Sequence, residues 1–338
     1  MRDDIAQQPA ALRAAIGYYR SAEGAARLAA APVERAPILT GMGASYHAAV
    51  AIAPYFHHLG VPALAVEATD LLYYSQALLQ ERRPLIFISQ SGASAEVAAV
   101  ADALLPGTAL LAVTNDAESL LARRAQLVLP TLAGKESGVA TKTYLNCLVV
   151  LWLLARRWGG TLSGEEAHML ERVTVECERL VADADAIAAR WLDVLGPAER
   201  LVFVGHGPHV AAARQAAMML AERARVAAIG TGVGAFRHGP IEIAQPELGA
   251  AVFAPPGRSS VSALGMAADL AGYSARVLIV EHGSSRVPGE PAGTAVDIEE
   301  FLAPVLDVIP AQIFADALAR QLGVGPEFRY IGKVTTRL

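Results

Sequence analysis

The feature that most constrains the fold is an alternation of short apolar runs with longer helical patterns. Parallel strands require crossover connections, so this alternation predicts parallel sheets covered by helices on both faces. The runs are almost wholly apolar, as expected for strands that are covered on both sides. The sequence therefore predicts an α/β fold. The runs lie at residues 36–41, 63–68, 84–90, 110–115 and 126–131, and again at 200–207, 226–231, 250–256 and 276–282.

An internal echo indicates two domains. Gly41-x-Gly43 and Gly205-x-Gly207 each follow an apolar run and open a helix rich in small residues. The two copies lie 164 positions apart, too far for a solenoid repeat and suitable for a duplicated α/β domain. The expected division is an N-terminal helical segment at 1–34, a first domain at 35–158, a helical connection at 159–196, a second domain at 197–325 and a C-terminal tail at 326–338.

Composition limits the classes of partner. The 338 residues carry a net charge of −5 and 54% hydrophobic residues, which is typical of a globular protein and argues against a nucleic-acid or membrane-surface partner. The apolar run 144–155 is too short to span a bilayer, and the acidic N-terminus is unlike a signal peptide. Cys147 and Cys177 lie in apolar helical stretches, form no disulfide or metal pattern, and suit a cytoplasmic location.

The paired glycines raise a dinucleotide-binding interpretation, and the sequence disfavours it. A Gly-x-Gly-x-x-Gly turn needs a third glycine, but Ala44, Ser45 and Tyr46 follow Gly43. Dinucleotide binding also needs an acidic residue at the end of the second strand, and Glu67 is only a weak candidate for it. The pattern Gly205-x-Gly207 likewise lacks the third glycine.

A serine-rich turn between a strand and a helix points to phosphate. It reads Ser89-Gln90-Ser91-Gly92-Ala93-Ser94, at the sheet edge where open parallel sheets bind ligands. Hydroxyls there can donate to a phosphate beside the free backbone N–H groups of the helix start, where the helix dipole favours negative charge. The alternative is helix capping, which explains one serine but not three. We therefore expect residues 89–94 to bind a phosphate.

Two polar residues of the second half are candidate acid–base groups. Glu222 lies on an otherwise apolar helix, where burial raises the pKa of a carboxyl and allows it to act as a base. His238 lies in a glycine-rich loop, where an imidazole can relay protons near neutral pH. The alternatives are an ion pair between Glu222 and Arg225 or another neighbour, and a loop histidine with only a structural role.

Several motifs in order resemble the sugar isomerase (SIS) domain family over nearly the whole chain. They are DIAQQPAALR, GMGASYHAA, SQSGASAEV, ESGVATKTY, FRHGPIEI and GKVTTRL. The sequence is most similar to the isomerase half of glucosamine-6-phosphate synthase and to stand-alone phosphosugar isomerases, deaminases and deglycases. This resemblance implies two tandem SIS domains, each a flavodoxin-like parallel sheet flanked by helices.

The resemblance also assigns roles to residues. The backbone near Val139 lines the sugar in this assignment, and no metal or redox cofactor is implied. The resemblance implies that Ser89, Gln90, Ser91 and Ser94 hold the phosphate of a sugar phosphate, with Ser45 beside them, and that Ala44 also belongs to the substrate-binding residues. Glu222 is implied as the base that moves a proton between C1 and C2. His238 is implied as the ring-opening group, reaching a neighbouring subunit's site in a homodimer with shared active sites. Lys333 is implied as the amine that forms a Schiff base; its alternative is a frayed, charged tail.

Two departures from the synthase narrow the expected activity. The chain has no room for a glutaminase domain, and Met219 occupies the position of a lysine one helical turn before the base. We therefore expect a cytoplasmic phosphosugar enzyme that isomerises, deaminates or deglycates a 6-phosphorylated sugar. The alternative is a non-catalytic sensor that only binds the sugar phosphate. The sequence leaves open which sugar, which amine and which direction of reaction apply.

Overall fold

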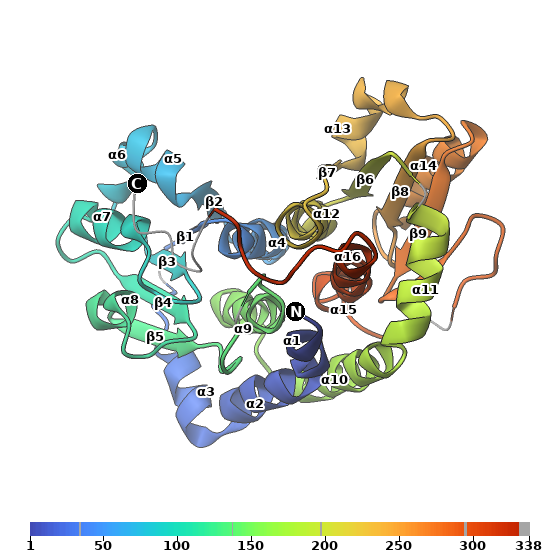
Figure 1. The fold of residues 1–338 in the computed structure, drawn as a ribbon. Helices are drawn as coiled ribbons and strands as arrows, with labels where there is room; N and C mark the ends of the chain where they lie inside the picture. The colour runs from blue at the N-terminus through green and yellow to red at the C-terminus, as the bar shows by residue number, and fades with distance from the viewer. Residues whose placement is uncertain (34, 137, 197, 294–295, 331–338) are drawn as a thin grey trace. The chain divides into compact units, whose positions relative to one another are not determined.

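The chain is described from a computed structural model, which covers residues 1–33, 35–136, 138–196, 198–293 and 296–330. It divides into two compact units (Figure 1). The first unit is Ala10–His168 with the chain from Phe328, and the second unit is Met169–Glu327 with Met1–Pro9. Lys333 lies outside the described residues.

The first unit is built on a wholly parallel sheet. Its strand order is β2-β1-β3-β4-β5, the order of flavodoxin-like folds, which confirms the architecture expected for this half. Ile38 of the central strand pairs with Leu64 on one side and with Leu85 on the other. The strands are β1 (Ile38–Gly41), β2 (Leu64–Glu67), β3 (Leu85–Ile88), β4 (Leu110–Thr114) and β5 (Leu127–Pro130).

Helices cover both faces of this sheet. Phe87, Val97 and Leu121 belong to one apolar cluster between the sheet and α5, α7 and α8, while α4 and α9 pack together on the opposite face (Figure 1). The apolar helix α9 carries the free, buried Cys147. The helices are α2 (Gln8–Arg20), α3 (Ala22–Ala29), α4 (Ala44–His58), α5 (Ala68–Tyr73), α6 (Gln76–Leu79), α7 (Ala95–Ala103), α8 (Leu120–Arg124) and α9 (Lys142–Trp158).

The second unit repeats this sheet with one change. Its order is β10-β9-β8-β6-β7, so β6 and β8 take the places of β1 and β3. The strands are β6 (Arg200–Gly205), β7 (Ala228–Gly232), β8 (Leu248–Phe253), β9 (Arg276–Glu281) and β10 (Ser284–Arg286). Gly43 and Gly207 have nearly identical backbone angles (φ 51° and ψ −123°, φ 51° and ψ −121°), so the internal echo is a duplication of local structure as well.

The second sheet has an additional edge strand, β10, that the sequence analysis did not predict. It runs antiparallel to β9, and the sequence pattern missed it because its three residues, Ser284–Arg286, are polar. The strands are joined by His282 and Gly283, whose φ angles are 49° and 77°. Two positive φ angles in succession are the geometry of a type I′ turn, which suits the twist of a two-residue hairpin.

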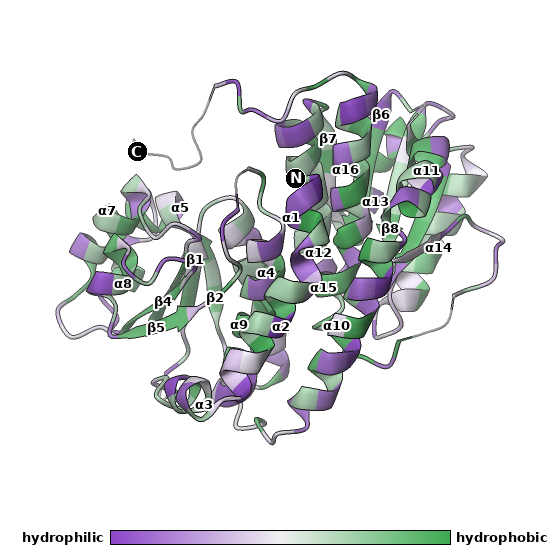
Figure 2. Ribbon diagram, turned by 60° about the horizontal axis from the view of Figure 1, so that its bottom comes forward, coloured by the Kyte–Doolittle hydropathy of each residue, from purple (hydrophilic) through white to green (hydrophobic). Residues whose placement is uncertain are grey.

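The helices of the second unit also form two layers. Val202, Phe236 and Met266 share an apolar cluster between the sheet and α13 and α14, whereas α11, α12 and α16 lie on the other face. Figure 2 shows the hydrophobic strands between these layers. The helices are α1 (Arg2–Ala6), α10 (Glu166–Ala182), α11 (Ala184–Leu195), α12 (Pro208–Met219), the π-helical turn η1 (Leu220–Ala224), α13 (Val233–Arg237), the 3₁₀ turn η2 (Pro240–Ile243), α14 (Ser260–Gly272), α15 (Pro304–Asp307) and α16 (Ile309–Gln321).

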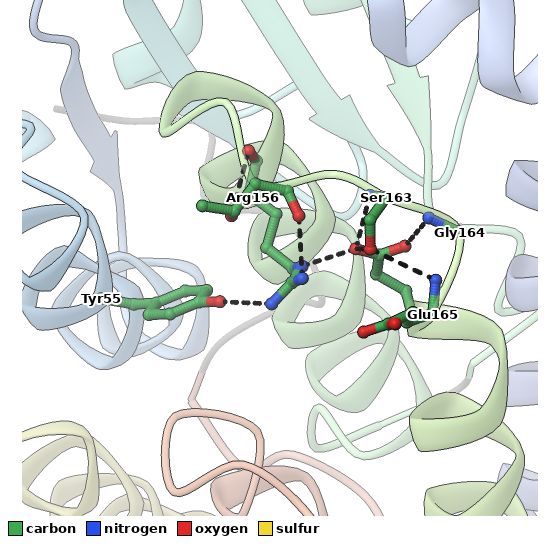
Figure 3. A network of polar contacts seen from close by, with 7 residues as sticks. Tyr55, Arg156, Ser163, Gly164 and Glu165 are labelled. Carbon is green, nitrogen blue, oxygen red and sulfur yellow. Dashed lines mark hydrogen bonds and ion pairs between the residues drawn. The ribbon is translucent and has the colours of Figure 1, made fainter.

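A polar network fixes the loop that leaves α9 in the first unit (Figure 3). Arg156 donates to Glu166 at 2.8 Å and to the Tyr55 hydroxyl at 3.1 Å, and its guanidinium lies 5.1 Å from the centre of the Trp152 ring. Burial opposes ionisation of Glu166, but hydrogen bonds from the Ser163 and Gly164 amides and from Arg156 hold its pKa below the usual value. The loop is therefore ordered by charge-assisted hydrogen bonds. Within the described part of the chain, no helix is both long enough and apolar enough to cross a membrane.

Candidate active site

The serine-rich turn leaves the end of β3 at a distinctive place in the sheet. The strand order reverses between β1 and β3, so the loops that follow these two strands diverge and leave room at the carboxyl edge. Open α/β sheets bind their ligands at such switch points. Residues 89–94 occupy the segment between β3 and α7, and residues 42–43 occupy the one between β1 and α4.

The hydroxyls of this turn use only part of their hydrogen-bonding capacity within the protein. Ser89 accepts a hydrogen bond from the Gly92 amide at 3.1 Å, and Ser91 accepts one from the Ala93 amide at 3.3 Å. A hydroxyl that accepts from an amide keeps its own O–H available as a donor. Ser94 occupies the N-cap position of α7 but makes no capping hydrogen bond through its side chain. Capping therefore does not account for the serines.

Gly92 sets the shape of the turn. Its φ is 56°, in the left-handed region, and a Cβ atom built there would lie 2.2 Å from the Ser119 hydroxyl oxygen. Both facts exclude a larger residue, because the strain and the clash would add. The Gly92 carbonyl accepts from the Leu121 amide at 2.9 Å, which ties the turn to the start of α8.

The loop after β1 approaches the same edge. A Cβ atom at Gly41 would lie 2.7 Å from the Ile88 carbonyl oxygen and 2.8 Å from the Ser45 Cβ atom. Glycine at this position therefore lets the start of α4, with Ala44 and Ser45, come against the end of β3. The structure thus brings the first residues of α4, Ala44 and Ser45, to the strand end from which the serine turn leaves.

A buried carboxylate organises the loop that carries Val139. One oxygen of Glu136 accepts from the Thr141 amide at 2.9 Å and from the Thr141 hydroxyl at 2.8 Å. The other oxygen accepts from the Thr143 hydroxyl at 2.7 Å. Glu136 and Val139 are each 4% exposed, so both residues are enclosed by the folded chain. Within the described residues, no cluster of His, Cys, Asp or Glu has the arrangement of a metal site.

Glu222 lies in the second unit, in the π-helical turn η1 that ends α12. π-helical turns are rare and are frequently found at functional sites. Burial raises the pKa of the half-buried Glu222 carboxyl to about 7. Arg223 pairs with Asp316 at 2.9 Å, and Arg225 donates to the Glu327 carbonyl at 3.3 Å. Among the described residues Glu222 has no ion pair, so the alternative of a Glu222–Arg225 pair is not observed.

His238 is the C-cap residue of α13, and it is exposed. Its side chain makes no hydrogen bond within the described part of the chain. The phosphate-turn candidates belong to the first unit, and Glu222 and His238 belong to the second.

Comparison with known proteins identifies the family. Residues 34–157, which enclose the serine turn and the Glu136 loop, match the SIS domain. The first unit contains a SIS domain. The resemblance indicated by the sequence motifs is therefore confirmed for this SIS domain, and the duplicated fold extends the architecture to the second unit.

The relatives and solved structures that match this chain include proteins named for sugar phosphates. The isomerizing glutamine–fructose-6-phosphate aminotransferase of Pyrococcus horikoshii is 32% identical over 343 residues, covering 97% of this chain and 56% of that protein. The chain thus spans about half the length of the curated relatives it matches. The C-terminal domain of glucosamine-fructose-6-phosphate aminotransferase from Francisella tularensis superposes with a TM-score of 0.83 at 18% identity, covering 96% of this chain and 97% of that one. Tagatose-6-phosphate ketose/aldose isomerase from Escherichia coli gives a TM-score of 0.80 at 22% identity, covering 97% and 95%.

Sequence reasoning about the SIS domain missed supporting residues of the site. Asn115, at the end of β4, accepts from the Thr131 hydroxyl at 3.0 Å and from the Ala133 amide at 2.8 Å. The backbone N–H of Asn115 donates to the Gln90 carbonyl at 3.1 Å, and this hydrogen bond connects the loop after β4 to the serine turn. A polar residue directly after an apolar strand was the available signal for Asn115. Glu136 is the first residue of the motif ESGVATKTY, but nothing in the sequence shows that its carboxylate is buried against Thr141 and Thr143.

Proposed function

We propose that this protein catalyses proton transfer between C1 and C2 of a 6-phosphorylated sugar or amino sugar. The outcome is aldose–ketose isomerisation, deamination or deglycation. The observation that carries the proposal is the serine turn at the β1/β3 switch point, with hydroxyl donors that neither capping nor internal hydrogen bonds use up. The names of the relatives, an aminotransferase that isomerises and a ketose/aldose isomerase, support the same substrate class.

The turn supplies the recognition of the phosphate. Ser89, Ser91 and Ser94 offer hydroxyl donors, and the first turn of α7 offers backbone N–H groups that have no partner within the helix. Gln90, within the turn, and Ser45, in the first turn of α4, complete the proposed set. Replacing Ser89 and Ser91 with alanine should weaken binding of a phosphosugar by about 1–3 kcal/mol, the scale of lost charge-assisted hydrogen bonds.

Glu222 is the proposed base. A base is most effective when its pKa is close to the working pH, and burial brings the pKa of Glu222 to about 7. The carboxylate would remove the proton from one carbon of the open-chain sugar and return it to the neighbouring carbon. Such a positioned group typically contributes about 10²–10⁴-fold to the rate. Met219 precedes Glu222 by about one turn and offers no charge to an amine, which supports a reaction other than that of the full synthase.

His238 and Lys333 complete the proposed mechanism. His238 is exposed, which suits a side chain that opens the sugar ring in the site of a second copy of this chain, within a homodimer. Lys333 is proposed to activate the carbonyl as a Schiff base. Mixing inactive His238→Ala chains with inactive Glu222→Gln chains tests the shared site, because each mixed dimer would contain one intact site. No recovery in chains shown to exchange would contradict the sharing.

Measurement of turnover distinguishes the enzyme hypothesis from the sensor hypothesis. Wild-type protein is incubated with fructose 6-phosphate, glucosamine 6-phosphate, galactosamine 6-phosphate and fructosyl-amino-acid 6-phosphates, and product and thermal shift are both measured. We expect turnover of at least one compound and its loss in Lys333→Met. A thermal shift with no turnover in the whole panel would instead support the sensor. Equal binding of a sugar with and without its phosphate would contradict the phosphate turn.

A further inference from the structure

The second unit contains a counterpart of the serine turn. In the first unit, six residues, 89–94, separate the end of β3 from the start of α7. In the second unit, six residues, 254–259, separate the end of β8 from the start of α14. Because β8 takes the place of β3 beside its central strand, the two turns occupy the same position in their sheets. The duplication therefore extends to the turn that we propose binds phosphate.

The two turns share their frame and differ in their ligand groups. The fourth residue is glycine in both, Gly92 and Gly257, and the sixth residue is serine in both, Ser94 and Ser259. The hydroxyls at the first and third positions are absent from the second copy, which reads Ala254-Pro255-Pro256. Arg258 stands at the fifth position, where the first copy has Ala93, so the second copy has exchanged neutral donors for a cation.

A carboxylate of the same chain already occupies the second turn. Glu300 accepts from the Arg258 backbone amide at 3.1 Å and from the Ser259 hydroxyl at 3.4 Å. The Arg258 guanidinium lies 3.8 Å from the same carboxylate. A Cβ atom at Gly257 would lie 2.5 Å from the carboxyl carbon, so glycine is needed for the carboxylate to sit this close to the turn.

The segment that carries Glu300 is held in place by the buried residues that follow it. The side chain of Glu300 is 13% exposed, and the residues that follow, Leu302 and Ala303, are buried ahead of α15. The Arg258 guanidinium also lies 5.3 Å from the centre of the Phe301 ring. The carboxylate is therefore held in place by packing as well as by charge, as an internal ligand would be.

We propose that Glu300 is a built-in anion that closes the second copy of the phosphate turn. It supplies the negative charge that the start of α14 and Arg258 attract, and it thereby prevents phosphate monoesters from binding to the second unit. Of the two turns, only the one in the first unit is then a phosphate site. Removing the Glu300 carboxylate opens a second one, whose ligand is inorganic phosphate or a phosphate monoester.

The test counts phosphate sites in variants whose first turn is disabled. Inorganic phosphate is titrated by equilibrium dialysis into Ser89→Ala/Ser91→Ala chains, alone and combined with Glu300→Ala or Glu300→Gln. We expect either Glu300 substitution to add one bound phosphate per chain. Adding Arg258→Ala to the Glu300 variants should then weaken that phosphate by at least about tenfold, the effect of losing one charge-assisted contact.

Controls separate this inference from a general charge effect and from the proposed function. Asp297→Asn removes one negative charge from the same segment, and because that side chain is 96% exposed and faces Arg172, it should add no phosphate. Glu300→Gln keeps the shape of the side chain and decides the matter if Glu300→Ala does not fold. No added phosphate in a folded Glu300 variant overturns the inference. Full phosphate binding by Ser89→Ala/Ser91→Ala alone counts against the proposed phosphate turn instead, and a second equivalent on removal of Glu300 would still support the inference.

Discussion

Substituting Glu222 with glutamine should stabilise the protein at alkaline pH and leave it unchanged in acid. Burial raises the pKa of this carboxyl from 4.5 to about 7 in the folded chain. Between these values the folded state holds a proton that the unfolded state has released. The free energy of unfolding therefore falls as the pH rises from about 4.5 to 7, and above 7 the full cost of a desolvated carboxylate remains. Glutamine has the same shape and avoids this cost.

The size of the effect follows from the pKa change. At 1.36 kcal/mol for each pKa unit, a rise from 4.5 to about 7 corresponds to at most about 3.4 kcal/mol. Glu222 is only half-buried, so screening by water reduces this upper value, and we expect about 1–2 kcal/mol. The raised pKa has burial as its cause, and no ion pair within the described residues offsets it.

The assay is denaturant unfolding of wild-type and Glu222→Gln protein at pH 4 and at pH 8.5. The variant should match the wild type at pH 4 and exceed it by about 1–2 kcal/mol at pH 8.5. Glu199→Gln is the matched control, because this carboxyl lies exposed in the same unit and its loss should change neither comparison. A stability difference between Glu222→Gln and wild type that is the same at both pH values would refute the reasoning.

Three further outcomes follow from local geometry. Gly92→Ala should cost at least about 2 kcal/mol and weaken phosphosugar binding, because it combines left-handed strain with a clash on Ser119; unfolding and titration check it. Glu136→Gln should cost about 1–3 kcal/mol in unfolding free energy, because the buried carboxylate accepts several hydrogen bonds. Burial lowers the pKa of His282, so wild-type stability should fall as the pH drops below about 6.5, and His282→Asn should reduce that loss in unfolding at pH 5.5 against pH 8.

The architecture was accessible from the sequence because both sheets are almost entirely apolar. Each of the nine predicted runs overlaps a strand, and the echo around Gly43 and Gly207 corresponds to matching backbone angles. The tenth strand escaped because a polar edge strand of three residues has neither length nor hydrophobic alternation. The chain reverses direction before β10 through the positive φ angles of His282 and Gly283, and a His-Gly pair in the sequence does not predict such a turn.

The site was accessible only in part, for a different physical reason. Ser89 and Ser91 stand out because a strand-to-helix turn needs fewer hydroxyls than this one carries. The π-helical turn at Glu222 and the internal ligand Glu300 depend on tertiary contacts, and no local pattern encodes them. Glu300 lies 42 positions from Arg258, so its relation to the turn emerges only when the chain is folded.

Exchange of solvent deuterium into the sugar phosphate tests the central claim most directly. Wild-type protein is incubated in D₂O with fructose 6-phosphate and the amino-sugar phosphates of the panel, and deuterium at C1 and C2 is followed by NMR. The account predicts incorporation with at least one phosphorylated sugar, none with the same sugar lacking phosphate, and its loss in Glu222→Gln. Exchange that continues at the wild-type rate in Glu222→Gln, or wild-type protein that binds the sugar phosphates and exchanges none of them, would contradict it.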